Sequence, residues 1–236
     1  MELEIWSDFV CPFCYMGKRR LETALRAFAH ADEVHLLWRS YQLDPELAAP
    51  AGTSIHDYLA ERKGMTRDWS VRVHAQVEKT AAELGLVYNF DTVILANSFN
   101  AHRLAHLAHS KGLQDRMQER LFAAYFTEGR DLGNPQTLLA LGTEVGLDPA
   151  ETQAMLAGGT FSDEVRRDGR EADELGAEGV PFFVIDRRYG FTGAQPSEQV
   201  LEVLTTAWSA LTTGPADVLQ AGPPSGSLIP REQRQP

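Results

Sequence analysis

The chain has 236 residues, 43 % of them hydrophobic, and a formal net charge of −11 at pH 7. A chain of this length and composition can bury a core without disulfides, as one large domain or as a domain with a sizeable insertion. The negative charge argues against nucleic acid or an anionic membrane surface as a partner, because both attract clustered Lys and Arg.

The chain begins MELEIWSDFV, with neither the basic segment nor the small-residue cleavage site of a secretion signal. No window approaches the roughly 18 apolar residues of a membrane span. We therefore expect a cytoplasmic protein without a membrane partner. Structural disulfides are rare in a reducing compartment, where a lone pair of cysteines is more often catalytic or metal-binding.

The first elements in chain order form a βαβ unit. Residues 3–9 alternate enough to predict a strand, residues 16–30 have the apolar spacing of a helix, and residues 34–41 are a second strand rich in Val, Leu, Trp and Tyr. Residues 54–176 then show helical periodicity with little strand signal. Glycine-rich breaks divide this block, and we expect five to seven helices in it.

Strand signals return after the helical block. Residues 180–186 and 189–192 are two short β runs separated by a charged turn, and residues 197–211 form an amphipathic helix. From residue 213 onward, the density of Pro and Gly predicts a mobile tail. We expect a thioredoxin-like domain from residues 1–53 and 177–212, an inserted helical subdomain at 54–176 and a tail at 213–236.

The chain has two cysteines, in the stretch FVCPFCYMGKRRLE, where an apolar run passes into a helical pattern. Cys11 at the first helical turn faces free backbone N–H groups and the positive end of the helix dipole, which stabilise a thiolate. Cys14 lies one turn on and can attack a mixed disulfide on Cys11. Pro12 suits an early helical position. Phe13 adds no positive charge, and Lys18 is expected to be exposed.

Several segments together resemble the DsbA-like oxidoreductases, specifically the FrnE-like branch, over about residues 2–211. The segments are the CPFC motif with YMGKRRLE after it, residues 39–43 before Pro45, LANSFNAHRLAHLA at 95–108, GVPFFV at 179–184 and GAQP at 193–196. This resemblance implies an α/β thioredoxin fold with a large all-helical subdomain inserted after the second strand.

The resemblance also implies further site residues. It implies a cis peptide bond between Val180 and Pro181, which would turn the backbone of Val180 toward the cysteines to pair with an extended substrate. The alternative is a trans proline that opens an edge strand. Asn97 and His102 would lie near the cleft and contact the substrate from the helical block, although Asn97 could instead cap a helix.

Other interpretations of these residues remain open. The two thiols could be inert and buried, or a metal could be bound with help from His102, His106 and His109, which share one helix face. We expect no metal. Four aromatic residues near the motif could form an apolar rim for substrates or belong to the core, namely Phe9, Phe13, Tyr15 and Phe182.

Three functions follow from these observations. The first is a thiol-disulfide oxidoreductase or disulfide isomerase acting on protein or small-molecule thiols and disulfides, with a Cys11–Cys14 disulfide, no bound cofactor and glutathione as a possible co-substrate. The second is a glutathione-dependent isomerase or transferase, similar to the hydroxychromene-carboxylate isomerases and kappa-class glutathione transferases. The third is a noncatalytic peptide-binding or chaperone-like module. The oligomeric state, monomer or homodimer, stays open.

Overall fold

The computed structural model describes residues 1–47 and 52–213 of the chain. Its centre is a four-stranded mixed sheet with the strand order β2-β1-β3-β4. Strand β1 (Glu2–Ser7) is parallel to β2 (His35–Ser40), while β3 (Phe182–Ile185) is antiparallel both to β1 and to β4 (Tyr189–Thr192). Strand β1 is central and is buried from Leu3 to Ser7, and its buried Glu4 is paired with Arg39 and Arg187.

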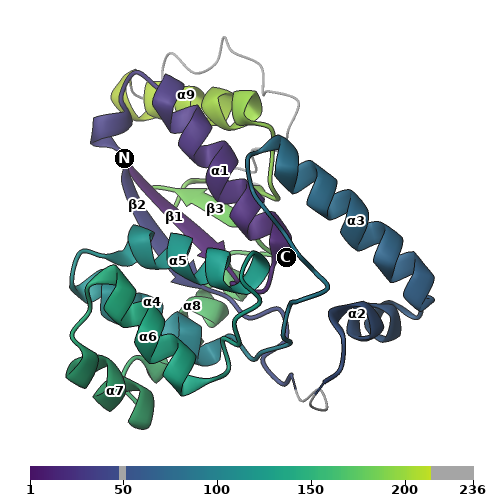
Figure 1. Cartoon of the computed structure of the whole chain (residues 1–236). Helices are drawn as coiled ribbons and strands as arrows, with labels where there is room; N and C mark the ends of the chain where they lie inside the picture. Colours follow the sequence, from purple (N-terminus) through teal and green to yellow (C-terminus); the bar gives the residue numbers. More distant parts are fainter. Residues whose placement is uncertain (48–51, 214–236) are drawn as a thin grey trace.

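Two helices lie side by side on one face of the sheet, α1 (Pro12–Ala27) and α9 (Ser197–Thr213) (Figure 1). Helix α8 (Ser162–Glu174) packs against the sheet at β2, where the Trp6 indole N–H donates to the Asp168 carbonyl at 2.7 Å. The strand order, the antiparallel return and this layering are those of a thioredoxin fold with a helical insertion after β2, so the predicted fold class is confirmed.

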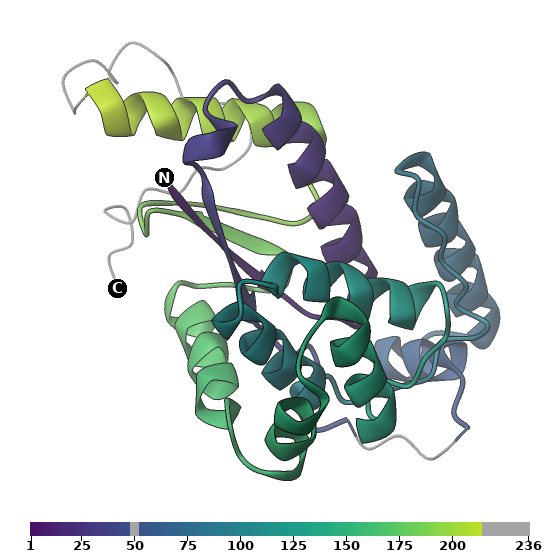
Figure 2. The same cartoon turned by 60° about the vertical axis from the view of Figure 1, so that its left-hand side comes forward.

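Seven helices lie between residues 54 and 176, within the predicted number. Besides α8 they are α2 (Ile55–Lys63), α3 (Arg67–Glu83), α4 (Phe99–Ser110), α5 (Gln114–Phe126), α6 (Pro135–Val145) and α7 (Pro149–Ala157). Helices α4 to α7 gather beside the sheet, while α3 stands apart from them and packs on α2 (Figures 1 and 2). Among the described residues, no helix is long and apolar enough to cross a membrane.

Local sequence signals explain where these helices begin and end. Side-chain oxygens cap four of them by accepting a backbone N–H of the first turn, from Ser54, Thr66, Asn134 and Asp148. Gly64 and Gly146 end α2 and α6 with positive φ angles of 64° and 106°. The predicted strand at 3–9 and helix at 16–30 are observed at 2–7 and 12–27.

Helix α1 takes part in two separate hydrophobic cores. Its first turns, with Cys14, Tyr15 and Met16, belong to the core of the helical block. Its later turns, with Leu21 and Ala24, belong to the core between the sheet and α9. The division at 53/54 and 176/177 stays a prediction, and α8 lies inside the predicted insertion while it covers part of the sheet. The predicted tail falls outside the described residues from 214 onward.

Candidate active site

The two cysteines lie where β1 turns into α1. After the strand, the chain turns at residues 8–10, and the Cys11 N–H donates to the Asp8 carbonyl at 3.1 Å. Cys11 is the N-cap residue of α1 with extended backbone, and Pro12 is the first helical residue. Proline is suited to this position because its missing N–H would have no partner in the helix. The motif therefore places Cys11 at the amino end of the helix and Cys14 in its first turn.

Both cysteines are free thiols with little exposed surface. Cys11 is 4 % exposed and Cys14 is 1 % exposed, whereas Phe13 between them is 48 % exposed. The Asp8 N–H donates to the Cys14 sulfur at 3.5 Å. Burial, followed by the neighbouring Cys11, raises the pKa of Cys14 well above its ordinary value. Cys14 is therefore held as a thiol in the reduced protein.

The segment before β3 lies against Cys11. The Cys11 thiol donates to the Val180 carbonyl at 3.5 Å, and the Val180–Pro181 peptide bond is cis. Helix α1 approaches this segment closely at Gly17, where an added Cβ would lie 3.0 Å from Pro181 Cγ. The structure thus brings Cys11, Cys14, Val180 and Pro181 together, although 169 positions separate Cys11 from Val180 in the chain.

A buried acid and a buried histidine lie behind the cysteines. The Asp8 carboxylate accepts the Leu43 N–H at 2.7 Å, and its other oxygen lies 3.4 Å from His102 Nε2. Asp8 is 0 % and His102 is 2 % exposed, and the imidazole packs on Phe9 in a tilted arrangement with 4.7 Å between ring centroids. His102 Nε2 has no hydrogen-bond partner among the described residues. Asp8 thus contacts Cys14 through its backbone N–H, while its carboxylate lies against the Leu43 N–H and His102.

Asp8 was not recognised in the sequence. Its one signal is an acidic residue directly after the buried strand β1, three positions before Cys11. Such a residue requires buried hydrogen-bond partners, which Leu43 and Val10 supply through their N–H groups.

Asn97 lies two positions before the first residue of α4, and His102 lies in the first turns of this helix. The Asn97 amide N–H₂ donates to the Pro45 carbonyl at 2.8 Å, and its oxygen accepts from Gln42 at 2.9 Å and from the Phe99 N–H at 3.0 Å. These bonds join the loop after β2 to the start of α4. The Phe99 contact matches the capping alternative for Asn97, and its role toward a substrate stays a prediction, as does that of His102.

The helical block also holds the backbone of the CPFC motif. The Tyr88 hydroxyl, in the segment between α3 and α4, donates to the Pro12 carbonyl at 2.7 Å. Tyr15 stacks on Phe122 of α5 with 4.9 Å between ring centroids. Phe9, Tyr15 and Phe182 are buried. Of the four aromatic residues considered for a rim, Phe13 therefore has the exposed ring.

The three histidines on α4 have different surroundings. His102 faces Asp8, whereas His106 Nε2 lies 3.0 Å from the Asp168 carboxylate and 3.1 Å from Ser40 Oγ. His109 is exposed. Within residues 1–47 and 52–213, no group of three or more His, Cys, Asp or Glu side chains is arranged to hold a metal ion.

Lys18 is buried, so the expectation that it would be exposed is wrong. Its side chain is 3 % exposed and forms ion pairs with Glu22, Asp115 and Glu119. Burial alone would lower the pKa of Lys18, but the surrounding carboxylates, Asp115 first, raise it. The positive charge of Lys18 is matched by acids from α1 and α5 instead of facing solvent.

Comparisons with known proteins bear on this site. The model of the DSBA-like thioredoxin domain family matches residues 2–205. A solved structure described as a probable DsbA oxidoreductase from Streptomyces coelicolor is 38 % identical, with 98 % of this chain and 99 % of that chain covered and a TM-score of 0.85.

Two further proteins are similar over most of the chain. An uncharacterised protein of Bacillus subtilis, YwbO, is 28 % identical over 187 residues, which are 78 % of this chain and 86 % of that protein. The solved structure of the cytosolic disulfide reductase DsbM from Pseudomonas aeruginosa with GSH is 21 % identical. It covers 88 % of this chain and 99 % of its own with a TM-score of 0.62, a likeness of fold.

Proposed function

Because the chain belongs to the DSBA-like thioredoxin domain family, we propose that it is a thiol-disulfide oxidoreductase or isomerase using Cys11 and Cys14. The observation that supports this most directly is the Cys11 thiol at the amino end of α1, in contact with the Val180 carbonyl. The free backbone N–H groups at the amino end of the helix face a sulfur at this position. The Val180 backbone beside it is the proposed contact for a substrate chain.

The proposed reaction takes two exchange steps. The Cys11 thiolate attacks one sulfur of a substrate disulfide, which forms a mixed disulfide and releases the other substrate sulfur as a thiolate. Cys14 then loses its proton, attacks the Cys11 sulfur and releases the second substrate thiolate. Two electrons pass to the substrate, each thiolate it releases takes up a proton, and the protein is left with a Cys11–Cys14 disulfide. The reverse sequence oxidises a substrate.

The surroundings of Cys14 suit the second step. Because burial raises the pKa of Cys14, this thiol stays protonated while Cys11 is the attacking group. Asp8, whose backbone N–H contacts the Cys14 sulfur, also has a buried carboxylate, which is the proposed base for that proton. Asn97 and His102 remain proposed contributors from the helical block.

The proposed partners are protein or small-molecule thiols and disulfides, with glutathione as co-substrate. The solved structure of DsbM with GSH supports glutathione, and its name as a cytosolic disulfide reductase is consistent with the proposed cytoplasmic location. The two sulfurs carry the electrons, so the proposal requires no bound cofactor.

A glutathione redox titration with mass-spectrometric counting of free thiols tests the proposal. We expect two thiols at reducing poise and none at oxidising poise. Phe13 supplies no charge, so we expect a midpoint between roughly −270 and −120 mV, the values of thioredoxin and DsbA. Two free thiols at every poise would contradict the oxidoreductase function.

A further inference from the structure

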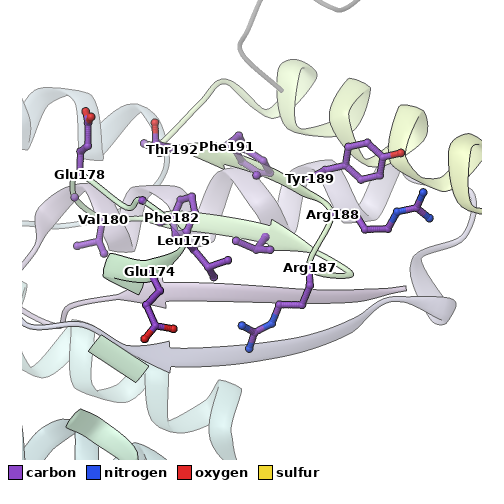
Figure 3. Close-up of a pocket in the computed structure, with 15 residues that line it drawn as sticks. Glu174, Leu175, Glu178, Val180, Phe182, Arg187, Arg188, Tyr189, Phe191 and Thr192 are labelled. Carbon is purple, nitrogen blue, oxygen red and sulfur yellow. The ribbon is translucent and has the colours of Figure 1, made fainter. Parts of the chain in front are cut away.

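A cavity of about 920 Å³ opens on the face of β3 and β4 that also faces α8 (Figure 3). Phe182 and Val184 of β3 and Gly190 of β4 line it along the sheet, and Leu175 lines it at the end of α8. The segment with Gly179 and Val180 lies at one end, and the turn with Arg187 and Arg188 lies at the other. The cavity therefore combines an apolar floor with charged ends.

The cavity exists because β4 is an edge strand that α8 does not cover. Helix α8 packs mainly at β2, on the far side of β1, and reaches β3 with Ala172, so that β4 is left uncovered. Gly190 adds no side chain over Phe182, whose ring would lie 3.5 Å from a Cβ at this position. Strand β4 pairs with β3 alone among the described strands, so alternate residues along it direct N–H and C=O groups to its open edge.

The cavity shares one residue, Val180, with the redox site. Val180 lines it, and the carbonyl of Val180 accepts a hydrogen bond from the Cys11 thiol. A polypeptide joined to Cys11 through its own cysteine would lie beside this end of the cavity. Its neighbouring residues could extend along β4, because an open strand edge binds an extended chain through backbone hydrogen bonds.

Charge distinguishes the two ends. Glu174 and Glu178 lie on the side of Val180, and Arg188 lies on the opposite side (Figure 3). Both glutamates are exposed, and the structure shows no ion pair for either of them or for Arg188 among the described residues. Arg187 differs, because Glu4 and Glu171 hold its guanidinium. The end near the redox sulfur is thus negative.

We propose that this cavity binds an extended segment of a protein substrate next to its reacting cysteine, and that it favours basic side chains near that cysteine. The inference rests on the proposed function and gives it a substrate class, namely polypeptides with Lys or Arg close to the cysteine. The backbone binds along β4 and an apolar side chain contacts Phe182. Separate basic side chains meet Glu174 and Glu178, whose carboxylates point away from each other (Figure 3).

The test compares two peptides and one small disulfide. Each peptide carries one cysteine as a mixed disulfide with glutathione, flanked on both sides by Arg in one peptide and by Glu in the other, and the small disulfide is oxidised glutathione. We expect kcat/KM for the Arg peptide to exceed that for the Glu peptide about fivefold, as two exposed ion pairs allow.

Replacing both glutamates, Glu174→Gln and Glu178→Gln, should abolish this preference. The control is the double variant Glu198→Gln with Glu202→Gln, which removes the same charge from α9 and should preserve the preference for the Arg peptide.

A second variant fills the cavity without altering its charge. Gly190→Val should lower kcat/KM for both peptides about tenfold relative to kcat/KM for oxidised glutathione. Oxidised glutathione serves as the reference because it has no extended chain to bind along β4. The inference would be overturned if the parent protein and the double glutamine variant preferred the Arg peptide to the same extent. It would also be overturned if Gly190→Val left the ratio of kcat/KM for the peptides to kcat/KM for oxidised glutathione unchanged. Failure of the protein to reduce any of the three disulfides would instead contradict the proposed function.

Discussion

The two cysteines have different surroundings although three positions separate them. Cys11 contacts the Val180 carbonyl at the edge of the site, whereas Cys14 is buried against the Asp8 N–H with a raised pKa. Cys11 is therefore the group that a substrate sulfur can meet, and Cys14 is the group that can attack Cys11 from behind. This difference assigns the nucleophile and the resolving thiol in the proposed reaction.

Single serine variants test this assignment. Cys11→Ser should abolish disulfide reduction in an insulin assay, because no thiolate remains at the helix end. Cys14→Ser should retain the first attack and accumulate mixed disulfides, which nonreducing electrophoresis and mass spectrometry detect. Equal trapping of substrate by both variants would refute the assigned roles.

The sequence predicts part of this site and misses another part for a physical reason. Cys11 and Cys14 could be recognised because spacing along one helix is visible in the sequence, and Pro181 through a family resemblance. Asp8 and Tyr88 could not, since their roles depend on contacts made by folding. The Tyr88 hydroxyl reaches the Pro12 carbonyl across 76 positions, and no periodicity records such a contact.

Among the elements, α1 and α5 are joined by a cluster of charges. Lys18 and Arg19 of α1 meet Asp115 and Glu119 of α5, and Glu22 completes the cluster. Lys18 is the most buried member, with 3 % of its side chain exposed. Its removal would leave neighbouring carboxylates with one cation fewer between two packed helices.

We expect Lys18→Met to lower the free energy of unfolding by about 2 kcal/mol, because breaking a buried ion pair leaves unmatched charge. Arg116→Met on α5 is the matched control, since it removes one positive charge from an exposed position. Urea unfolding of the reduced proteins measures both changes. Similar losses in the two variants would show that burial of Lys18 is not what stabilises the contact.

Helices α2 and α3 share a buried pair of histidines. His74 Nδ1 lies 2.8 Å from His56 Nδ1, and His74 stacks on Phe90 with 4.1 Å between ring centroids. Burial, and secondarily His56, lowers the pKa of His74 to about 4. A histidine with a depressed pKa stabilises the fold above its unfolded pKa of about 6.5, and this contribution is lost as the pH falls toward 4.

Stability should therefore fall between about pH 6.5 and 4, by about 2 kcal/mol for His74. His74→Gln can still hydrogen-bond to His56 but does not titrate, so it should flatten that part of the stability profile. His109→Gln removes an exposed histidine and should leave the profile unchanged. Denaturant midpoints at several pH values provide the measurement, and equal slopes in His74→Gln and the parent protein would contradict the prediction.

The elements themselves were largely predictable, while the packing of α8 was not. Apolar periodicity located the four strands and the two helices beside them, α1 and α9, within a few residues, and predicted the number of helices in the inserted block. Helix α8 has the charged sequence SDEVRRDGREADE, and its buried residues are Val165, Asp168 and Ala172. An aspartate is normally exposed, so the sequence conceals the face that packs on the sheet.

At the scale of the whole molecule, Asp168 joins three parts of the fold. Its buried carboxylate accepts the Ser40 N–H at 2.9 Å, lies 3.3 Å from Arg39 NH1 and 3.0 Å from His106 Nε2. Burial alone would raise the pKa of Asp168, but the hydrogen bonds from His106 and Ser40 outweigh it and lower the pKa. One side chain of α8 thereby connects β2 with α4.

Asp168→Ala should cost about 3 kcal/mol of stability or more, because Arg39 and the Ser40 N–H lose a buried partner. Asp163→Ala in the first turn of α8 is the control, with a side chain that is 99 % exposed, and should cost less than about 1 kcal/mol. Tryptophan fluorescence and circular dichroism should report one shared transition in the parent protein. A loss in Asp168→Ala no larger than in the control would rule out this connecting role.

Because α1 belongs to two cores, a redox change at its first turns should affect the packing of the helical block and not the packing of α9. The turns that carry the cysteines pack into the helical block, while the later turns pack beneath α9. We expect a disulfide closed at the start of α1 to shift side chains that contact α5 and the segment before α4, and to leave the contacts of α9 unchanged. A conformation-sensitive antibody against the α5 face would therefore distinguish the oxidised from the reduced protein, whereas one against α9 would bind both alike.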